Sequence, residues 1–153
     1  MSQTTVQTGE DKPKARRFEP PVSPTTQAFW DATREQRFLL QWCTDCQRAI
    51  FFPREVCPSC LGSSLAWKES VGRGRVYTFT VEHRPQNPNL VGPYTVALID
   101  LEEGVRMMSN VIDCDPDQVT AGMEVGIAWE ALSDGRHLPM FAPTDSTAPG
   151  GDR

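Results

Sequence analysis

Cys43-Thr44-Asp45-Cys46 and Cys57-Pro58-Ser59-Cys60 are two Cys-x2-Cys pairs separated by ten residues. Each pair can turn tightly enough to direct two sulfur atoms at one metal ion, and two such pairs complete a tetrahedral shell. The sequence therefore predicts one structural zinc ion held by Cys43, Cys46, Cys57 and Cys60. Because protein sulfurs fill every position, the site has no place for water or substrate and no role as a Lewis acid. Iron also binds four thiolates, but the wider separation of the pairs in rubredoxin-type centres disfavours it.

Three short apolar stretches surround the cysteines and have the lengths of the three small strands of a zinc ribbon. They are residues 38–42, 50–53 and 65–67. Gly62 follows the second pair and supplies the backbone freedom that a chain often needs when it leaves such a turn. We therefore expect the ribbon to extend over residues 38–69.

A helix is expected before the ribbon, over residues 23–37. Ser23 is a favourable N-cap, and Pro24 suits the first helical turn because its missing N–H has no partner there. Phe29 and Trp30 are the large apolar residues of this segment, but they form a poor stripe for packing on a barrel. Two alternatives follow for this pair: it covers the ribbon, or it docks on a partner protein.

The region after the ribbon alternates with the period of two that is typical of β-strands. Strands are expected over residues 71–83, 94–101, 105–112, 123–132 and 136–141. Asp115-Pro116-Asp117 is a helix-start sequence between the third and fourth of them, and it predicts about one helical turn. Five strands with a helical insertion at this point favour an OB barrel over residues 70–142, with a five-stranded SH3-like barrel as the structural rival.

The ends of the chain and its overall charge narrow the classes of protein further. Residues 1–22 and 143–153 are polar and are expected to be a flexible arm and a flexible tail. No apolar stretch reaches the roughly 18 residues that span a membrane, and no signal peptide is recognisable, so we expect a cytoplasmic protein with reduced thiols. The net charge of −5 among 153 residues disfavours a general nucleic-acid-binding role.

No catalytic residue is predicted, since neither of the two histidines lies near a suitable nucleophile in the sequence. Five arginines are grouped in an otherwise acidic chain: Arg48, Arg54, Arg73, Arg75 and Arg84. They are either ordinary surface residues or a site for a phosphate-bearing ligand, because arginine makes bidentate contacts to phosphate.

The order of these motifs resembles that of the zinc-ribbon/OB-fold acyl-CoA-associated proteins, the family catalogued as domain of unknown function thirty-five. The resemblance covers about residues 25–142. The motifs that carry it are Phe29-Trp30, the four cysteines, Phe52-Pro53-Arg54, residues 72–77, Asp115-Pro116-Asp117 and Gly122-Met123.

The resemblance implies a noncatalytic, zinc-binding subunit that forms a hetero-oligomer with a thiolase-fold enzyme and helps to hold or pass on a CoA thioester. The partner it implies is a thiolase coupled to hydroxymethylglutaryl-CoA synthase, a β-oxidation-type thiolase, including those of aromatic degradation, or a steroid side-chain aldolase. It places Phe52, Pro53 and Arg54 near the CoA arm, with Arg73, Arg75 and Arg84 as further candidates for CoA binding. Two other functions stay open: a single-stranded nucleic-acid-binding module and a rubredoxin-like electron carrier.

Overall fold

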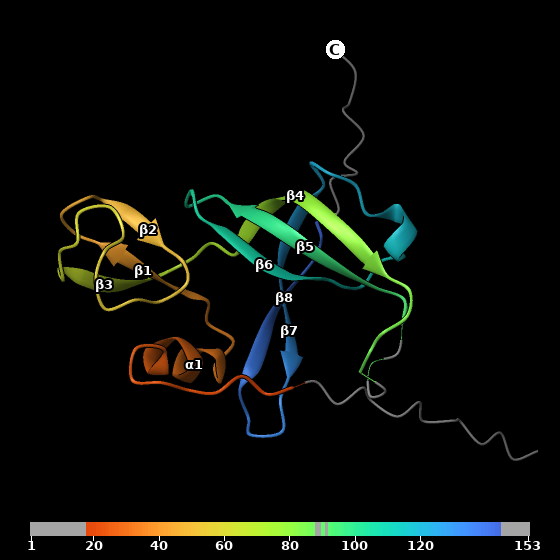
Figure 1. The fold of residues 1–153 in the computed structure, drawn as a ribbon, viewed down its shortest axis with the longest axis horizontal. Helices are drawn as coiled ribbons and strands as arrows, with labels where there is room; N and C mark the ends of the chain where they lie inside the picture. The colour runs from red at the N-terminus through yellow and green to blue at the C-terminus, as the bar shows by residue number, and fades with distance from the viewer. Residues whose placement is uncertain (1–17, 88–89, 91, 145–153) are drawn as a thin grey trace, which may run out of the picture.

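Residues 18–87, 90 and 92–144 are described in the computed structural model, where they form a short helix, a three-stranded sheet and a closed five-stranded barrel (Figure 1). The helix α1 (Gln27–Thr33) precedes the ribbon strands β1 (Leu39–Cys43), β2 (Arg48–Ile50) and β3 (Leu65–Glu69). The barrel contains β4 (Arg73–Glu82), β5 (Tyr94–Leu101), β6 (Arg106–Val111), β7 (Glu124–Ala131) and β8 (His137–Pro143). The predicted fold class, mainly β with an N-terminal helix, a zinc ribbon and an OB barrel, is confirmed.

The barrel has the strand order β4-β5-β6-β8-β7 and closes through the pairing of β4 with β7. All of its ladders are antiparallel except that between β6 and β8, which are parallel at Val111 and Phe141. A 3-10 turn (Pro116–Gln118) lies between β6 and β7, and the Asp115 carboxylate caps it by accepting a bond from the Asp117 N–H. This is the order and the insertion point of the OB barrel, so the SH3-like alternative is wrong.

The alternation of β5 explains how the barrel fills its interior. Thr95, Ala97, Ile99 and Leu101 are buried, and the residues between them are only partly so. Gly74 of β4 lies so close to β5 that a Cβ atom there would be 2.5 Å from the carbonyl oxygen of Asp100. A side chain at this position would therefore push the two strands apart.

The helix is shorter at both ends than the predicted residues 23–37. Ser23 and Thr26 bond to each other, with the Thr26 N–H donating to the Ser23 carbonyl at 3.0 Å, so they form a turn in place of a first helical turn. Beyond the helix, Gln36 has a φ of 55°, which is incompatible with continued helical geometry.

Glu19 and Pro20 are anchored to the turn between β7 and β8, within the residues expected to form the flexible arm. The Glu19 carboxylate accepts bonds from the N–H and hydroxyl groups of Ser133, and the Pro20 carbonyl accepts one from Arg136 at 2.8 Å. At the other end, Pro143 belongs to β8, so the predicted tail begins too early. The rest of the predicted arm and tail, residues 1–17 and 145–153, lies outside the described residues.

Helix, ribbon and barrel share one hydrophobic core. Phe29 contacts Trp30 edge-on at a centroid distance of 5.0 Å and Phe38 at 6.2 Å, and Phe38 in turn contacts Phe141 at 6.4 Å. Phe29 and Trp30 are only 5% and 9% exposed. The structure therefore favours the covering role for this pair over the predicted docking on a partner. Among the described helices, none has the length and apolar character needed to cross a membrane.

Candidate metal centre

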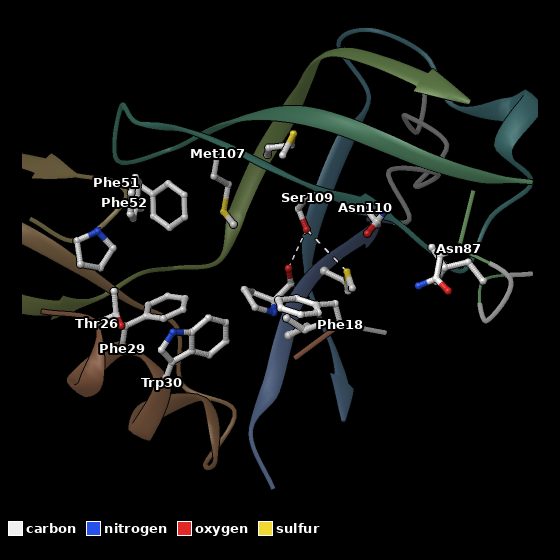
Figure 2. A pocket seen from close by; sticks show the side chains of 16 residues that line it. Phe18, Thr26, Phe29, Trp30, Phe51, Phe52, Asn87, Met107, Ser109 and Asn110 are labelled. Atoms are coloured by element: carbon white, nitrogen blue, oxygen red, sulfur yellow. Dashed lines mark hydrogen bonds between the residues drawn. The ribbon is translucent and has the colours of Figure 1, made fainter. Parts of the chain in front are cut away.

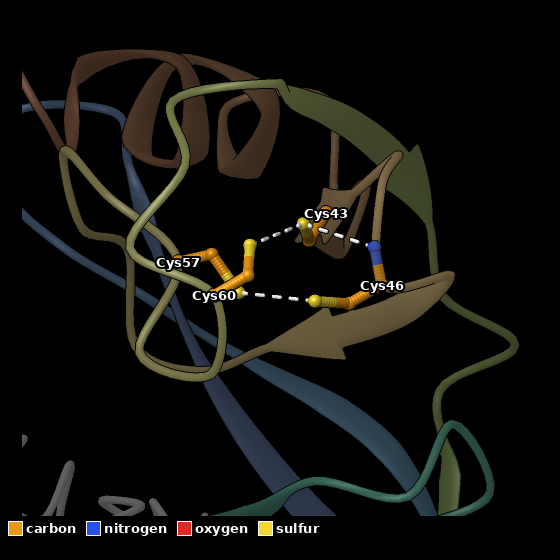
Figure 3. Close-up of side chains that lie close together, drawn as sticks. All are labelled: Cys43, Cys46, Cys57 and Cys60. Carbon is orange, nitrogen blue, oxygen red and sulfur yellow. Dashed lines mark hydrogen bonds between the residues drawn. The ribbon is translucent and has the colours of Figure 1, made fainter.

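The four cysteines of the two Cys-x2-Cys pairs converge at one end of the ribbon sheet, where Cys43 pairs with Leu65 (Figure 3). Their sulfur atoms all lie within 4.8 Å of one another, with 3.8 Å between Cys43 and Cys60 and 3.9 Å between Cys46 and Cys57. A tetrahedral zinc ion with Zn–S bonds of about 2.3 Å needs sulfurs separated by about 3.8 Å. The four cysteines are therefore arranged to bind zinc.

Local backbone geometry holds the sulfurs in place. The Cys46 N–H points at the Cys43 sulfur at 3.3 Å, and the Ser59 N–H points at the Cys57 sulfur at 3.4 Å. The residue after each pair turns the chain through the left-handed region, with φ values of 53° at Gln47 and 60° at Leu61. Leu61 thus supplies the backbone turn that was predicted for Gly62.

Gly62 contributes space rather than conformational freedom. A Cβ atom at this position would lie 3.2 Å from a carboxylate oxygen of Asp45 and 3.4 Å from the Cys60 sulfur. The absence of a side chain therefore lets the second turn approach the first.

The surroundings of the sulfurs affect their protonation. Backbone N–H groups of Cys60 and Ser59 lower the pKa of Cys57 to about 6. Hydrogen bonding to the Cys60 thiol, followed by burial, raises the pKa of Cys46 to about 12. Without a metal the site therefore retains protons, which zinc binding releases as four thiolates form. A zinc ion bound there cross-links two turns and has no open position for chemistry.

The Phe52-Pro53-Arg54 segment lies beside the ribbon in a bend, although residues 50–53 were predicted as a strand; β2 ends at Ile50. The amide of Gln41, a buried residue of β1, accepts a bond from the Arg54 N–H at 2.8 Å and donates one to the Arg54 carbonyl at 2.9 Å. The Gln41 side chain therefore satisfies the backbone N–H and carbonyl of Arg54, which a neighbouring strand would otherwise do. The Arg54 guanidinium lies 5.6 Å from the centre of the Phe52 ring. Gln41 is a positioning residue that the sequence did not reveal.

The five arginines do not form one cluster. Arg48 and Arg54 border one hollow beside the ribbon, where Arg48 donates to the Ser59 hydroxyl at 3.3 Å. Arg73 and Arg75 lie on another part of the barrel and pair with Glu102 and Glu124.

Arg84 follows β4 at its opposite end, where its backbone N–H donates to Glu82. Of the five arginines, Arg48 and Arg54 are the two that border the hollow beside the ribbon.

A cavity of about 460 Å³, which the sequence did not predict, lies between α1, the Phe52-Pro53 bend and strands β6 and β8 (Figure 2). Phe29, Trp30, Met107 and Met108 are among its walls. The consecutive methionines of β6 were a possible signal, because flexible thioether side chains are common at binding surfaces.

The described histidine near this region has a structural role. His137 Nδ1 donates to the Thr33 carbonyl oxygen at 2.8 Å, and its ring contacts Trp129 edge-on. These contacts fix α1 against β8. The expectation that the chain has no catalytic residue stays a prediction.

Comparison with known proteins agrees with the two-part architecture. Residues 30–66 match the family model described as the rubredoxin-like zinc ribbon domain of ChsH2, and residues 67–130 match its C-terminal OB-fold domain. A DUF35 domain-containing scaffold protein from Methanocaldococcus jannaschii is 34% identical over 94 residues, which are 60% of this chain and 67% of the relative. The chain belongs to the DUF35 family.

Two further similarities place this DUF35 protein among relatives associated with larger assemblies. A solved structure described as an Ltp2-ChsH2(DUF35) aldolase matches with a TM-score of 0.75 and 31% identity, over 82% of this chain and 98% of that chain. A probable enoyl-CoA hydratase alpha subunit from Thermomonospora curvata is 36% identical over 137 residues. The match covers 88% of this chain but only 42% of that subunit, so the chain spans less than half of its length.

Proposed function

We propose that this chain is the noncatalytic, zinc-binding subunit of an acyl-CoA thiolase or aldolase complex, in which it stabilises a thiolase-fold partner and helps to bind or channel the CoA thioester. The observation that carries the proposal is the similarity to the DUF35 chain of the Ltp2-ChsH2 aldolase, which is matched over 98% of its length. A metal site closed by four sulfurs supports a structural role, because it offers no position to a substrate.

Arg54 is the CoA-binding candidate that the geometry supports best. CoA carries several negative charges, and a chain with a net charge of −5 needs local cations to attract it. Arg73 and Arg75 are already paired with carboxylates, whereas Arg54 has no ion pair among residues 18–87, 90 and 92–144. Its backbone is held on both sides by Gln41, so the guanidinium extends from a fixed point.

An enoyl-CoA hydratase complex is the second candidate, supported by the 36% identity to the Thermomonospora curvata subunit. A CoA thioester is the shared ligand in both cases, so the identity of the partner separates the two candidates. Affinity purification of the tagged full-length chain from its native extract, followed by mass spectrometry, identifies that partner. We expect a thiolase-fold protein. Recovery of a hydratase chain alone would favour the second candidate, and recovery of neither would reject the proposal.

Arg54→Ala tests the assignment of the CoA site within the recovered complex. We expect the KM for the CoA thioester to rise about tenfold, since a hydrogen bond to a charged group is worth roughly 1.5–3 kcal/mol. Assembly, measured by size-exclusion chromatography, should be unchanged. Arg75→Ala is the matched control, because Arg75 is an exposed arginine already paired with Glu124. A larger effect on assembly than on KM would indicate that Arg54 lies at the interface with the partner protein.

The alternative functions are separated by two simple measurements. A single-stranded nucleic-acid-binding module retains labelled oligonucleotides on a filter at low salt. An electron carrier with four thiolates contains iron and is coloured. We expect no retention and a colourless, zinc-loaded protein.

A further inference from the structure

The cavity beside the ribbon has walls from segments that are far apart in the sequence. Phe29 and Trp30 of α1 lie on one side, and Met107 and Ser109 of β6 lie on the other (Figure 2). Phe52 borders it and is 57% exposed. Its volume of about 460 Å³ is within the range of small-molecule sites, about 300–1,000 Å³.

The chemistry of the walls selects an uncharged, hydrophobic occupant. No acidic, basic or histidine side chain lines the cavity in the part of the chain that the structure describes. Its polar groups are largely engaged: the Ser109 hydroxyl donates to the Pro139 carbonyl at 2.7 Å, and the Asn110 amide donates to the Thr95 carbonyl at 2.8 Å. A charged group entering this space would lose hydration without gaining a partner.

The terminal segments of the chain are poor candidates for the occupant. Residues 1–17 contain six charged side chains and only Met1, Val6 and Ala15 as apolar residues. Residues 145–153 are equally polar, with two aspartates and an arginine. Burying either segment would desolvate charges against apolar walls. Neither of these two segments therefore supplies the occupant.

A second hollow adjoins the cavity and carries positive charge. Phe51 borders both spaces, and the second is also lined by Arg48, Arg54 and Glu103. One oxygen of Glu103 already accepts a bond from the Val71 N–H, and the two arginines leave an excess of one positive charge. One ligand can therefore place a hydrophobic group in the cavity and an anionic group beside the arginines.

We propose that the cavity binds the hydrophobic acyl group of a CoA thioester while the anionic part of the same molecule lies beside Arg54. The inference rests on the proposed function for the presence of CoA. It adds the substrate class: an acyl group that is uncharged and longer than acetyl. A free fatty acid shares this combination of an apolar chain and an anionic head, so the experiment includes it as a separate arm.

The experiment is calorimetric titration of the full-length, zinc-loaded chain with acetyl-CoA, hexanoyl-CoA and free hexanoate. Each buried CH2 group raises affinity by up to about fourfold, so the four additional carbons of hexanoyl-CoA should tighten binding by at least about tenfold over acetyl-CoA. Hexanoate should bind at least about tenfold more weakly than hexanoyl-CoA, because it lacks the phosphates that Arg54 contacts.

A pair of matched variants locates the effect. Met108→Lys places a charge at the rim of the cavity on a residue that is 68% exposed, so folding should be unaffected. We expect it to reduce the preference for hexanoyl-CoA over acetyl-CoA to threefold or less. Val56→Lys is the control, because Val56 is 44% exposed and lines neither the cavity nor the second hollow. It should leave the preference unchanged.

Equal affinities for acetyl-CoA and hexanoyl-CoA, or no binding of either, would overturn the inference. Hexanoate binding as tightly as hexanoyl-CoA would overturn the role of Arg54 and indicate a fatty-acid site. These outcomes are independent of the affinity purification. If the purification recovers a thiolase-fold partner but the titration shows no preference for hexanoyl-CoA, the proposed function stands and the cavity assignment fails. If the titration shows the preference but no such partner is recovered, only the cavity assignment stands.

Discussion

Replacing Cys57 with serine removes one of the four sulfurs that are arranged to bind zinc. Cys57 is completely buried, and its sulfur lies 3.9 Å from that of Cys46 in the other pair. A serine hydroxyl is a poor zinc ligand at neutral pH, because it keeps its proton, whereas a cysteine thiol loses its proton and binds the metal as a thiolate. We therefore expect Cys57→Ser to lose the metal.

The consequence of that loss follows from how little else stabilises this end of the ribbon. Apart from the cysteines, its small core contains only Ile50, with Leu65 packed against it. Two such side chains contribute about 3–6 kcal/mol when fully buried, whereas a structural zinc ion contributes roughly 10–16 kcal/mol in isolated zinc fingers. Residues 44–64 should therefore lose their order, while Phe38 and Leu40 remain in the core shared with the barrel.

Hydrogen exchange with mass spectrometry, combined with metal analysis, measures this result. The wild type should contain one zinc ion per chain and protected amides at both ends of the ribbon. In Cys57→Ser, protection should disappear from residues 44–64 and persist in β5 and β8. Cys114→Ser is the control, because Cys114 lies outside the sulfur cluster. A Cys57→Ser protein that keeps stoichiometric zinc and protected amides in the ribbon would refute the reasoning.

Three further predictions concern the barrel and its contacts. Arg136→Ala should lower the free energy of unfolding by about 3 kcal/mol, because this buried guanidinium bonds to the Pro20 carbonyl and the Asp134 carboxylate. Urea titration measures the change. A loss below about 1 kcal/mol would contradict the anchoring of the N-terminal segment. Gly74→Ala should cost up to about 3 kcal/mol through its clash with the β5 backbone. Thermal unfolding should show a smaller loss for the control Gly126→Ala, where the nearest atom to an added Cβ is the side-chain methyl carbon of Thr144 at 3.1 Å. A hydrogen bond from the Arg106 guanidinium holds the pKa of Asp100 in the folded protein below its usual range. The stability that this pair contributes is therefore fully present above the pKa that Asp100 has in the unfolded chain. It is lost as the pH falls through the pKa that Asp100 has in the folded protein. An NMR titration of Asp100 should show its pKa returning toward the usual range in Arg106→Gln; an unchanged pKa would exclude the ion pair as the cause.

The features predicted correctly from the sequence depend on contacts between residues close in the chain. Each Cys-x2-Cys pair forms its own turn, and the spacing alone restricts which metal geometry the two turns can build. The capped turn at Asp115 and the alternating burial of β5 are equally local. Together with the count of five strands, these signals were sufficient to favour the OB barrel.

Errors arose where proximity in sequence was taken for proximity in space. Arg54 and Arg73 are only 19 positions apart, yet they border different hollows. The partners that neutralise Arg73 and Arg75 come from a turn and from β7, on other parts of the chain. No pattern within residues 48–84 could have shown these ion pairs.

By itself, the sequence determined the four metal ligands, the ribbon and the OB barrel, because short-range turns and strand periodicity specify them. Only the tertiary structure decided that Phe29 and Trp30 are buried, that Arg136 anchors Pro20 across 116 positions, and that a cavity adjoins the hollow lined by Arg54. These features depend on how α1, the ribbon and the barrel pack together. Contacts of that kind join distant segments, and their geometry is set by the whole core rather than by any local pattern.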